Sequence, residues 1–272
     1  MVAIGAMPEP RRFPLMRILL TLLAILAVLY LAACAAIFFR QRSMIYYPQP
    51  SANGTSAERM TLAVDGAQVV VSVRRHNGPK ALIYFGGNAE DVSANLPALP
   101  AAFPDRAVYL MHYRGYGGST GTPSEKALQQ DALLLFDKVR AEHPDVTVMG
   151  RSLGSGLAVR LAAARPVERL ILVTPYESLS GLAAALFPYF PVRWLLLDRY
   201  ESGRWAPRVT APTLIIAAES DEVIPRWSTE QLHARFPGGV AIMKVIAGAG
   251  HNTISEDPAY WQALQGTSRA GN

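Results

Sequence analysis

The sequence predicts an α/β domain with a mostly parallel, doubly wound sheet, preceded by a single membrane-spanning helix. Short apolar runs alternate with helix-like patterns from about residue 58 onward, as expected when helices cover both faces of a parallel sheet. A separate run near the amino terminus is apolar and uncharged. Hydrophobic residues make up 50% of the 272 residues and charged residues only 17%, which excludes disorder over most of the length and supplies a full core.

The amino-terminal segment Ile18–Phe39 carries no charged side chain over its 22 residues. As a helix rising about 1.5 Å per residue it would span about 33 Å, enough for the hydrocarbon core of a bilayer. Arginines flank it on both sides: Arg11, Arg12 and Arg17 before it, Arg40 and Arg42 after it. Because positive charge favours the cytoplasmic side, this distribution predicts a single-pass bacterial inner-membrane protein whose folded domain faces the periplasm.

An alternative for this segment is a lipoprotein signal, since Leu31-Ala32-Ala33-Cys34 resembles a bacterial lipobox and Cys34 would then carry lipid. The residues after Cys34 stay apolar, which favours a continuing helix over a solvated tether. A cleaved secretory signal fits less well, because the apolar run exceeds the usual ~7–15 residues. The predicted division is therefore a tail over 1–17, an anchor over 18–39, a Pro-, Gly- and Ser-containing linker over 40–57 and a folded domain over 58–272.

The elements of the folded domain follow from the period of the apolar residues. Met60–Val64 and Gln68–Arg74 alternate apolar and polar residues around Asp65-Gly66, which predicts an antiparallel hairpin. Continuous apolar runs predict buried parallel strands at Ala81–Phe85, Ala107–Met111, Val146–Met149, Arg169–Val173, Thr213–Ala217 and Ala241–Ile246. Helical spacing predicts helices at Ser124–Arg140, Ser155–Ala164, Ser228–Phe236 and Asp257–Gln265.

A candidate nucleophile follows the third of the predicted parallel strands. Residues 150–154 read Gly-Arg-Ser-Leu-Gly, a G-x-S-x-G pattern between a strand and a helix. A serine on such a sharp turn needs small neighbours two residues away, and its hydroxyl then projects above the carboxyl ends of the strands. This context predicts that Ser152 is a catalytic nucleophile.

A serine nucleophile requires a base and an acid that orients the base, here expected in the chain order Ser, acid, His. Of the two later histidines, His233 lies inside a predicted helix, whereas His251 follows Gly248-Ala249-Gly250 directly after the last strand. We therefore predict that His251 is the base. The acid is expected after Thr213–Ala217, where Asp221 is preferred for its short side chain and its place before a Val-Ile-Pro turn; Glu219 and Glu222 are the other candidates.

The reaction also needs two N–H donors for a developing oxyanion. The backbone N–H of Leu153 follows the nucleophile, and the loop after the first parallel strand offers the backbone N–H of Asn88. Gly86 and Gly87 would let that loop approach the substrate closely. No G-K-[ST] pattern follows these glycines, so a phosphate-binding loop is not indicated.

The longest excursion from the predicted sheet, about 176–208, is apolar and aromatic. It is expected either to pack on the sheet or to form a small lid that lines an acyl pocket. Tyr176 and Phe187 are the residues of this region expected to contact substrate, together with Gly86 and Gly87.

Taken together, these motifs resemble the α/β-hydrolase superfamily and, more narrowly, its bud-emergence-type branch of membrane-anchored serine hydrolases. The residues that carry the resemblance are Phe85-Gly-Gly-Asn-Ala, Tyr113-Arg-Gly-Tyr-Gly-Gly-Ser119 with Gly121-Thr-Pro-Ser124, Gly150-Arg-Ser-Leu-Gly154, Asp221-Glu-Val-Ile-Pro225 and Gly250-His251. The resemblance implies the α/β-hydrolase fold with a small lid and an amino-terminal anchor, and the triad Ser152, Asp221 and His251. It also implies carboxylesterase, lysophospholipase or acyl-thioesterase activity. The sequence departs from the family at Gly86, where histidine is usual, and at His112, where aspartate is common.

The remaining expectations concern partners. The positive charge is not gathered into a basic block, so nucleic acid is not an expected partner, and neither cysteine nor histidine spacing indicates a metal site. No cofactor is required for the predicted chemistry; the expected partners are a small acyl ester or lipid and the membrane. A serine peptidase on the same fold and a non-catalytic, membrane-bound pseudo-hydrolase are the alternative functions.

Overall fold

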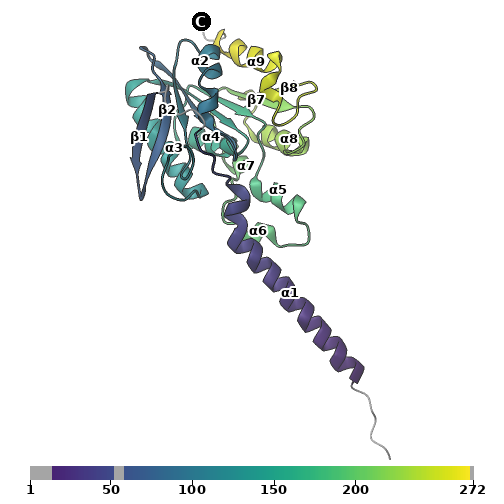
Figure 1. Cartoon of the computed structure of the whole chain (residues 1–272). Helices are drawn as coiled ribbons and strands as arrows, with labels where there is room; N and C mark the ends of the chain where they lie inside the picture. Colours follow the sequence, from purple (N-terminus) through teal and green to yellow (C-terminus); the bar gives the residue numbers. More distant parts are fainter. Residues whose placement is uncertain (1–13, 52–57, 270–272) are drawn as a thin grey trace, which may run out of the picture. The chain divides into compact units, whose positions relative to one another are not determined.

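The computed structural model describes residues 14–51 and 58–269. Its core is one sheet of eight strands in the order β1-β2-β4-β3-β5-β6-β7-β8, with β1 and β8 at opposite edges (Figure 1). The strands are β1 Glu58–Val64, β2 Ala67–Arg74, β3 Lys80–Phe85, β4 Ala107–Met111, β5 Asp145–Arg151, β6 Arg169–Val173, β7 Thr213–Ala218 and β8 Ala241–Ile246. Every predicted strand is present, and the α/β-hydrolase fold class is confirmed.

Strand β2 is antiparallel to both of its neighbours, whereas the strands from β4 to β8 run parallel. The turn Asp65-Gly66 closes the β1–β2 hairpin, and Gly66 has the positive φ of 68° that favours glycine. Since the parallel strands all end at the same edge, the loops that follow β3, β5, β7 and β8 meet there.

Helices cover both faces of the sheet and divide its core in two. On one face pack α3 Glu125–Glu142, α4 Leu153–Ala164 and α8 Arg226–Arg235; on the other pack α2 Ala98–Ala102 and α9 Pro258–Arg269. Alternate residues of β3 point to opposite cores, Ile83 to the first and Leu82 to the second. This alternation explains why the parallel strands β3 to β7 are mainly apolar: both of their faces are buried, whereas the edge strand β8 is largely exposed. The side chain of Ser124 caps α3 by accepting a hydrogen bond from the N–H of Ala127, as its position in the sequence predicts.

Helix α1 extends over Pro14–Ile45, well beyond the predicted anchor 18–39. It is long and apolar enough to cross a membrane, and its apolar side chains are exposed along most of its length. The predicted linker 40–57 is therefore wrong for residues 40–45, which are helical. The prediction was too short because an uncharged run identifies only the part of a helix that can lie in hydrocarbon. The helix itself continues past this run, since no glycine or proline follows until Pro48. Residues 1–13 and 52–57, which include Arg11 and Arg12, lie outside the described residues.

The segment after the helix packs on the domain, so the compact unit begins at Arg42 and not at residue 58. Tyr46 is buried, and its hydroxyl lies 3.2 Å from Asp198 Oδ2 and 2.8 Å from the hydroxyl of Tyr200. The N–H of Tyr47 donates to the carbonyl of Asn88 over 3.2 Å. The side chain of Tyr46 and the backbone of Tyr47 therefore hold this segment against the folded domain.

The region between β6 and β7 contains α5 Leu179–Leu186, α6 Val192–Leu195 and α7 Ser202–Trp205. Its first part, α5 and α6 with the loops beside them (residues 179–197), lies within the predicted lid region 176–208 and is called the lid below. Several large apolar side chains of the lid are exposed, led by Tyr189 and Trp194 at 86% each and Leu186 at 75%. The lid is therefore only partly packed on the domain.

Candidate active site

Ser152 lies at the turn between β5 and α4 in a strained backbone conformation, with φ 49° and ψ −118°. The turn is held by the N–H of Ser152, which donates to the carbonyl of Val173 over 2.9 Å. Glycine is required on both sides, because a Cβ on Gly150 would collide with the carbonyl of Gly154, and a Cβ on Gly154 would collide with the carbonyl of Phe85. The G-x-S-x-G spacing thus has the steric origin that the sequence predicts.

A continuous hydrogen-bonded chain joins Ser152 to a histidine and an aspartate. His251 Nε2 lies 3.0 Å from Ser152 Oγ, and His251 Nδ1 lies 3.0 and 2.9 Å from the two carboxylate oxygens of Asp221. Because the carboxylate only accepts, Nδ1 carries the proton and Nε2 is free to accept from the serine hydroxyl. The side chains of His251 and Asp221 are 5% and 6% exposed, so bulk water is largely excluded from the pair.

The structure separates the three carboxylates of the β7 loop by what each one binds. Asp221 Oδ1 also accepts the N–H groups of Val223 and Ile224, which fixes the carboxylate toward His251. Glu222 Oε2 accepts the backbone N–H of His251 over 3.0 Å, and this hydrogen bond is the largest cause that lowers the pKa of Glu222. Glu219 Oε2 accepts the N–H of Gly248 over 2.8 Å. The two glutamates therefore hold the backbone of the histidine loop.

The expected oxyanion donors lie in two loops that touch each other. Leu153 is the first residue of α4, where the helix dipole favours negative charge. The N–H of Gly154 donates to the carbonyl of Gly86 over 3.1 Å, which ties the nucleophile turn to the loop after β3. Within the described chain, the backbone N–H groups of Asn88 and Leu153 have no intramolecular acceptor. Both are therefore available to a bound oxygen atom.

Two tyrosines donate hydrogen bonds to carbonyl groups of the loop after β3. The hydroxyl of Tyr113 donates to the carbonyl of Gly86, and the hydroxyl of Tyr116 donates to the carbonyl of Asn88, each over 2.7 Å. Burial is the largest cause that raises the pKa of both phenols, so they stay neutral donors. Their hydrogen bonds give both tyrosines a structural role in this loop.

The residues expected to contact substrate occupy different environments. A Cβ on Gly87 would lie 3.7 Å from the Cβ of Ser152, so this glycine borders the nucleophile. Tyr176 is buried and donates its hydroxyl to the carbonyl of Leu153 over 3.2 Å, a position behind the nucleophile turn. Phe187 follows α5 and is half-buried at the edge of the core. Substrate contact by Gly86, Gly87, Tyr176 and Phe187 stays a prediction.

His112, where the family often has aspartate, is buried at the end of β4 with its Nε2 2.8 Å from Ser72 Oγ. Burial is the largest cause that lowers its pKa, to about 4, so the ring is neutral at physiological pH. A neutral ring explains how this position accommodates histidine without placing a charge in the core. His233, by contrast, sits on α8, and its Nε2 lies 3.2 Å from the carbonyl of Ala241 in the edge strand β8.

Glu90 and Arg151, which no sequence motif pairs, form an ion pair directly beside Ser152, with Arg151 Nη1 3.0 Å from Glu90 Oε2. Arg151 belongs to the G-x-S-x-G motif and Glu90 to the predicted oxyanion loop, so both residues lie in motifs that the sequence predicts to be functional. Their pairing left no local signal, because the two residues are 61 positions apart.

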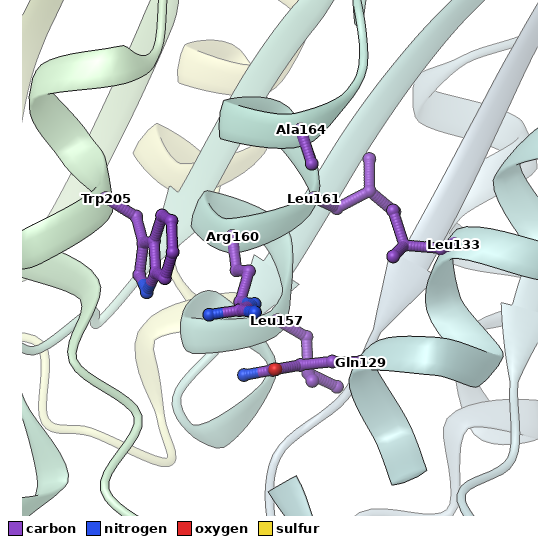
Figure 2. Close-up of a pocket in the computed structure, with 7 residues that line it drawn as sticks. All are labelled: Gln129, Leu133, Leu157, Arg160, Leu161, Ala164 and Trp205. Atoms are coloured by element: carbon purple, nitrogen blue, oxygen red, sulfur yellow. The ribbon is translucent and has the colours of Figure 1, made fainter. Parts of the chain in front are cut away.

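A separate pocket lies between α3, α4 and α7 and is lined by Gln129, Leu133, Leu157, Arg160, Leu161, Ala164 and Trp205 (Figure 2). The guanidinium carbon of Arg160 stacks 4.1 Å from the centre of the Trp205 ring. None of the lining residues can act as a nucleophile or a carboxylate acid, so this pocket offers no alternative to the predicted triad. Within the described residues, no group of three or more His, Cys, Asp or Glu side chains could hold a metal ion.

Comparison with known proteins identifies the family. A family model described as serine aminopeptidase, S33 (Hydrolase_4) matches residues 101–196. An uncharacterized protein of Mycobacterium tuberculosis, Rv2307c, is 33% identical over 249 residues, covering 85% of this chain and 88% of that protein. The chain belongs to the α/β-hydrolase superfamily.

One further relative and one solved structure are also similar to this α/β hydrolase. Lysophosphatidylserine lipase ABHD12 of Macaca fascicularis is 34% identical over 138 residues, which cover 43% of this chain and 35% of that protein. The structure of Est1E from Butyrivibrio proteoclasticus, with ferulic acid bound, superimposes with a TM-score of 0.65 at 16% identity, over 77% of this chain and 97% of that one. The structural likeness supports the fold. The narrower resemblance to the bud-emergence-type branch stays a prediction.

Proposed function

We propose that this α/β hydrolase is a membrane-anchored serine hydrolase that cleaves carboxylic ester or thioester bonds of acyl or lipid-like substrates. The observation that carries the proposal is the hydrogen-bonded chain from Asp221 through His251 to Ser152 at the carboxyl edge of the sheet. Such a chain is the arrangement that lets a histidine remove the proton of a serine hydroxyl.

In the proposed reaction, Ser152 Oγ attacks the acyl carbonyl carbon while its proton moves to His251 Nε2. The backbone N–H groups of Asn88 and Leu153 bind the oxyanion, and Asp221 stabilises the imidazolium that forms. His251 then gives the proton to the leaving alcohol or thiol, which departs and leaves an acyl-Ser152 ester. Water, activated by the same histidine, releases the carboxylic acid and restores the serine.

The acyl or lipid-like substrate class rests on two features. Exposed apolar side chains of the lid offer contact area to an acyl chain, and α1 is long and apolar enough to anchor the enzyme where lipids are found. The name of the ABHD12 relative agrees with a lipid substrate. Anchoring through α1 with the domain on the periplasmic side of a bacterial inner membrane is part of the proposal, and lipidation at Cys34 is its alternative.

The test is labelling of the detergent-solubilised full-length chain with a fluorophosphonate probe, beside the Ser152→Ala variant. We expect labelling of the wild type and none of the variant. Hydrolysis of p-nitrophenyl esters of short and long acyl chains, measured in parallel, sorts a short-chain esterase from a lipid hydrolase. A folded wild type that neither labels nor hydrolyses any ester would leave the pseudo-hydrolase reading instead.

A serine peptidase is the second candidate, because the matching family model is described as a serine aminopeptidase. The same assay separates the two when an amino-acid p-nitroanilide is added as a substrate. Cleavage of the anilide with a kcat/KM above that of every ester would favour the peptidase.

A further inference from the structure

The ion pair between Glu90 and Arg151 is partly shielded from solvent, with the two side chains 13% and 18% exposed. Glu90 belongs to the loop after β3, and Arg151 is the last residue of β5, next to Ser152. An ion pair at such a depth is weak grounds for stability, because desolvation offsets much of the attraction. The other hydrogen bonds of the two side chains indicate a role at the site.

Glu90 fixes the loop that carries an expected oxyanion donor. Its Oε2 accepts the N–H of Gly87 over 2.7 Å, and its Oε1 accepts the hydroxyl of Tyr84 and the side-chain amide of Asn95, also over 2.7 Å each. Gly87 directly precedes Asn88 in the chain, so the carboxylate sets the orientation of the peptide next to the donor.

Arg151 fixes the loop that carries the histidine. Its Nη2 donates to the carbonyl of His251 and to Asn252 Oδ1, both over 3.2 Å. Together the pair connects the β3 loop, the nucleophile turn and the histidine loop, which supply the oxyanion donors, the nucleophile and the base. Strand order alone would bring these three loops to one edge but would not set the distances between them.

The charges of the pair matter as well as its hydrogen bonds. A carboxylate beside Gly87 opposes the negative charge that develops on a substrate oxygen bound by Asn88 and Leu153. The positive charge of Arg151 offsets the negative charge of the Glu90 carboxylate. Burial lowers the pKa of this guanidinium, but Glu90 and Tyr84 raise it by more, so that Arg151 stays charged.

We infer that Glu90 and Arg151 are a positioning pair that aligns the oxyanion loop and the histidine loop around Ser152, and that Arg151 offsets the Glu90 charge during oxyanion formation. The inference rests on the proposed serine hydrolase function. It predicts that loss of the pair acts on the transition state, and that loss of Arg151 alone is worse than loss of both charges.

The test compares Arg151→Met, Glu90→Gln and the double variant with a matched pair elsewhere. Arg106 and Glu168 form a second Arg–Glu pair, with side chains 7% and 33% exposed, at the residues that directly precede β4 and β6. Because those strands are parallel to the others, this pair lies at the amino edge of the sheet, opposite the site. Arg106→Met therefore removes a comparable ion pair without touching the reactive centre.

Each full-length variant is assayed in detergent for kcat and KM with a p-nitrophenyl ester, and for the Ki of a trifluoromethyl ketone, which adds to the serine as an anionic tetrahedral adduct. We expect Arg151→Met to lower kcat about 100-fold and to raise Ki by a similar factor, with KM changed less than about threefold. Glu90→Gln should lower kcat about tenfold. The double variant should have a higher kcat than Arg151→Met, because no unpaired carboxylate remains. Arg106→Met should keep kcat and Ki within about twofold of wild type while it lowers the midpoint of thermal unfolding.

Arg151→Met and Arg106→Met with the same kcat and Ki would overturn the inference, and so would a double variant whose loss equals the product of the single losses. Should Arg151→Met not fold, as judged by circular dichroism, Arg151→Lys keeps the charge but loses the forked hydrogen bonds, and an unchanged kcat and Ki for that variant would also overturn it. A wild type that is not labelled at Ser152 overturns the proposed function and this inference together. A labelled wild type beside an unaffected Arg151→Met overturns this inference alone.

Discussion

The loops at the carboxyl ends of the strands and the lid belong to the same proposed site, but they are built in opposite ways. In the loops, the side chains of His251 and Asp221 are 5% and 6% exposed and hydrogen-bonded to each other, and the half-buried Ser152 has a strained backbone with a φ of 49°. In the lid, Tyr189 and Trp194 are 86% exposed. The side chains of the loops are thus held by hydrogen bonds, whereas the exposed side chains of the lid offer surface to the proposed acyl substrate. Changes in the loops should therefore act on kcat and on folding, and changes in the lid on substrate preference.

The largest effect is expected in the loops at Asp221. Asp221→Asn removes the carboxylate that holds the proton on His251 Nδ1, so kcat should fall about 10³–10⁴-fold. Steady-state hydrolysis of a p-nitrophenyl ester measures the loss. Glu219→Gln is the matched control in the same loop, since the Glu219 carboxylate accepts the N–H of Gly248 and not a proton of His251, and should change kcat less than about threefold. Equal losses in the two variants would mean that Asp221 is not the acid.

The steric fit of the nucleophile turn should dominate stability. In Gly154→Ala the new methyl group would overlap the carbonyl of Phe85, and we expect a loss of more than about 3 kcal/mol in the free energy of unfolding or a failure to fold. Gly266→Ala, in helix α9 with open space around its Cβ, should instead stabilise by up to about 1 kcal/mol. Urea unfolding followed by circular dichroism compares the two, and a Gly154→Ala protein as stable as wild type would show that the turn is looser than described.

Buried His112, directly after β4, should make the free energy of unfolding depend on pH. Its folded pKa of about 4 lies below the unfolded value of about 6.5, so the unfolded chain binds the proton more tightly. The free energy of unfolding should therefore fall by about 3 kcal/mol as the pH drops from 6.5 to 4, and this contribution should be fully present above pH 6.5.

His112→Gln, which keeps a hydrogen-bonding group for Ser72, should flatten that part of the pH dependence. Urea unfolding at pH 8 measures the cost of the substitution when the histidine is neutral in both states, and unfolding at pH 4.5 then isolates the protonation. The same slope in both proteins would assign the acid sensitivity to other groups.

The smallest effects are expected in the lid. Trp194→Ser removes an exposed side chain, so the free energy of unfolding should change by less than about 0.5 kcal/mol. The kcat/KM for long-chain p-nitrophenyl esters should fall by about three- to tenfold, and that for short-chain esters should stay constant. Ile242→Ser, at another exposed apolar position on strand β8, is the control and should change neither. A loss of activity on both chain lengths would show that the lid shapes the reactive centre itself.

Local patterns in the sequence predicted the fold and the three residues of the proposed triad. Strand and helix periods, the G-x-S-x-G turn, and glycines before His251 are all signals among near neighbours, and the structure places the corresponding side chains in one hydrogen-bonded chain. The preference for Asp221 over two adjacent glutamates also rested on local features, and the structure shows the physical reason in the two backbone N–H groups that aim its carboxylate.

Only the tertiary structure decided which distant residues pair. The predicted linker packs on the domain because Tyr46 reaches Tyr200, 154 residues further along the chain, and the pairing of Glu90 with Arg151 spans 61 residues. The length of α1 past Phe39 likewise left no sign in the charge pattern. A single sequence records what each residue prefers with its neighbours, but a hydrogen bond between distant residues depends on how the strands between them are ordered in the sheet.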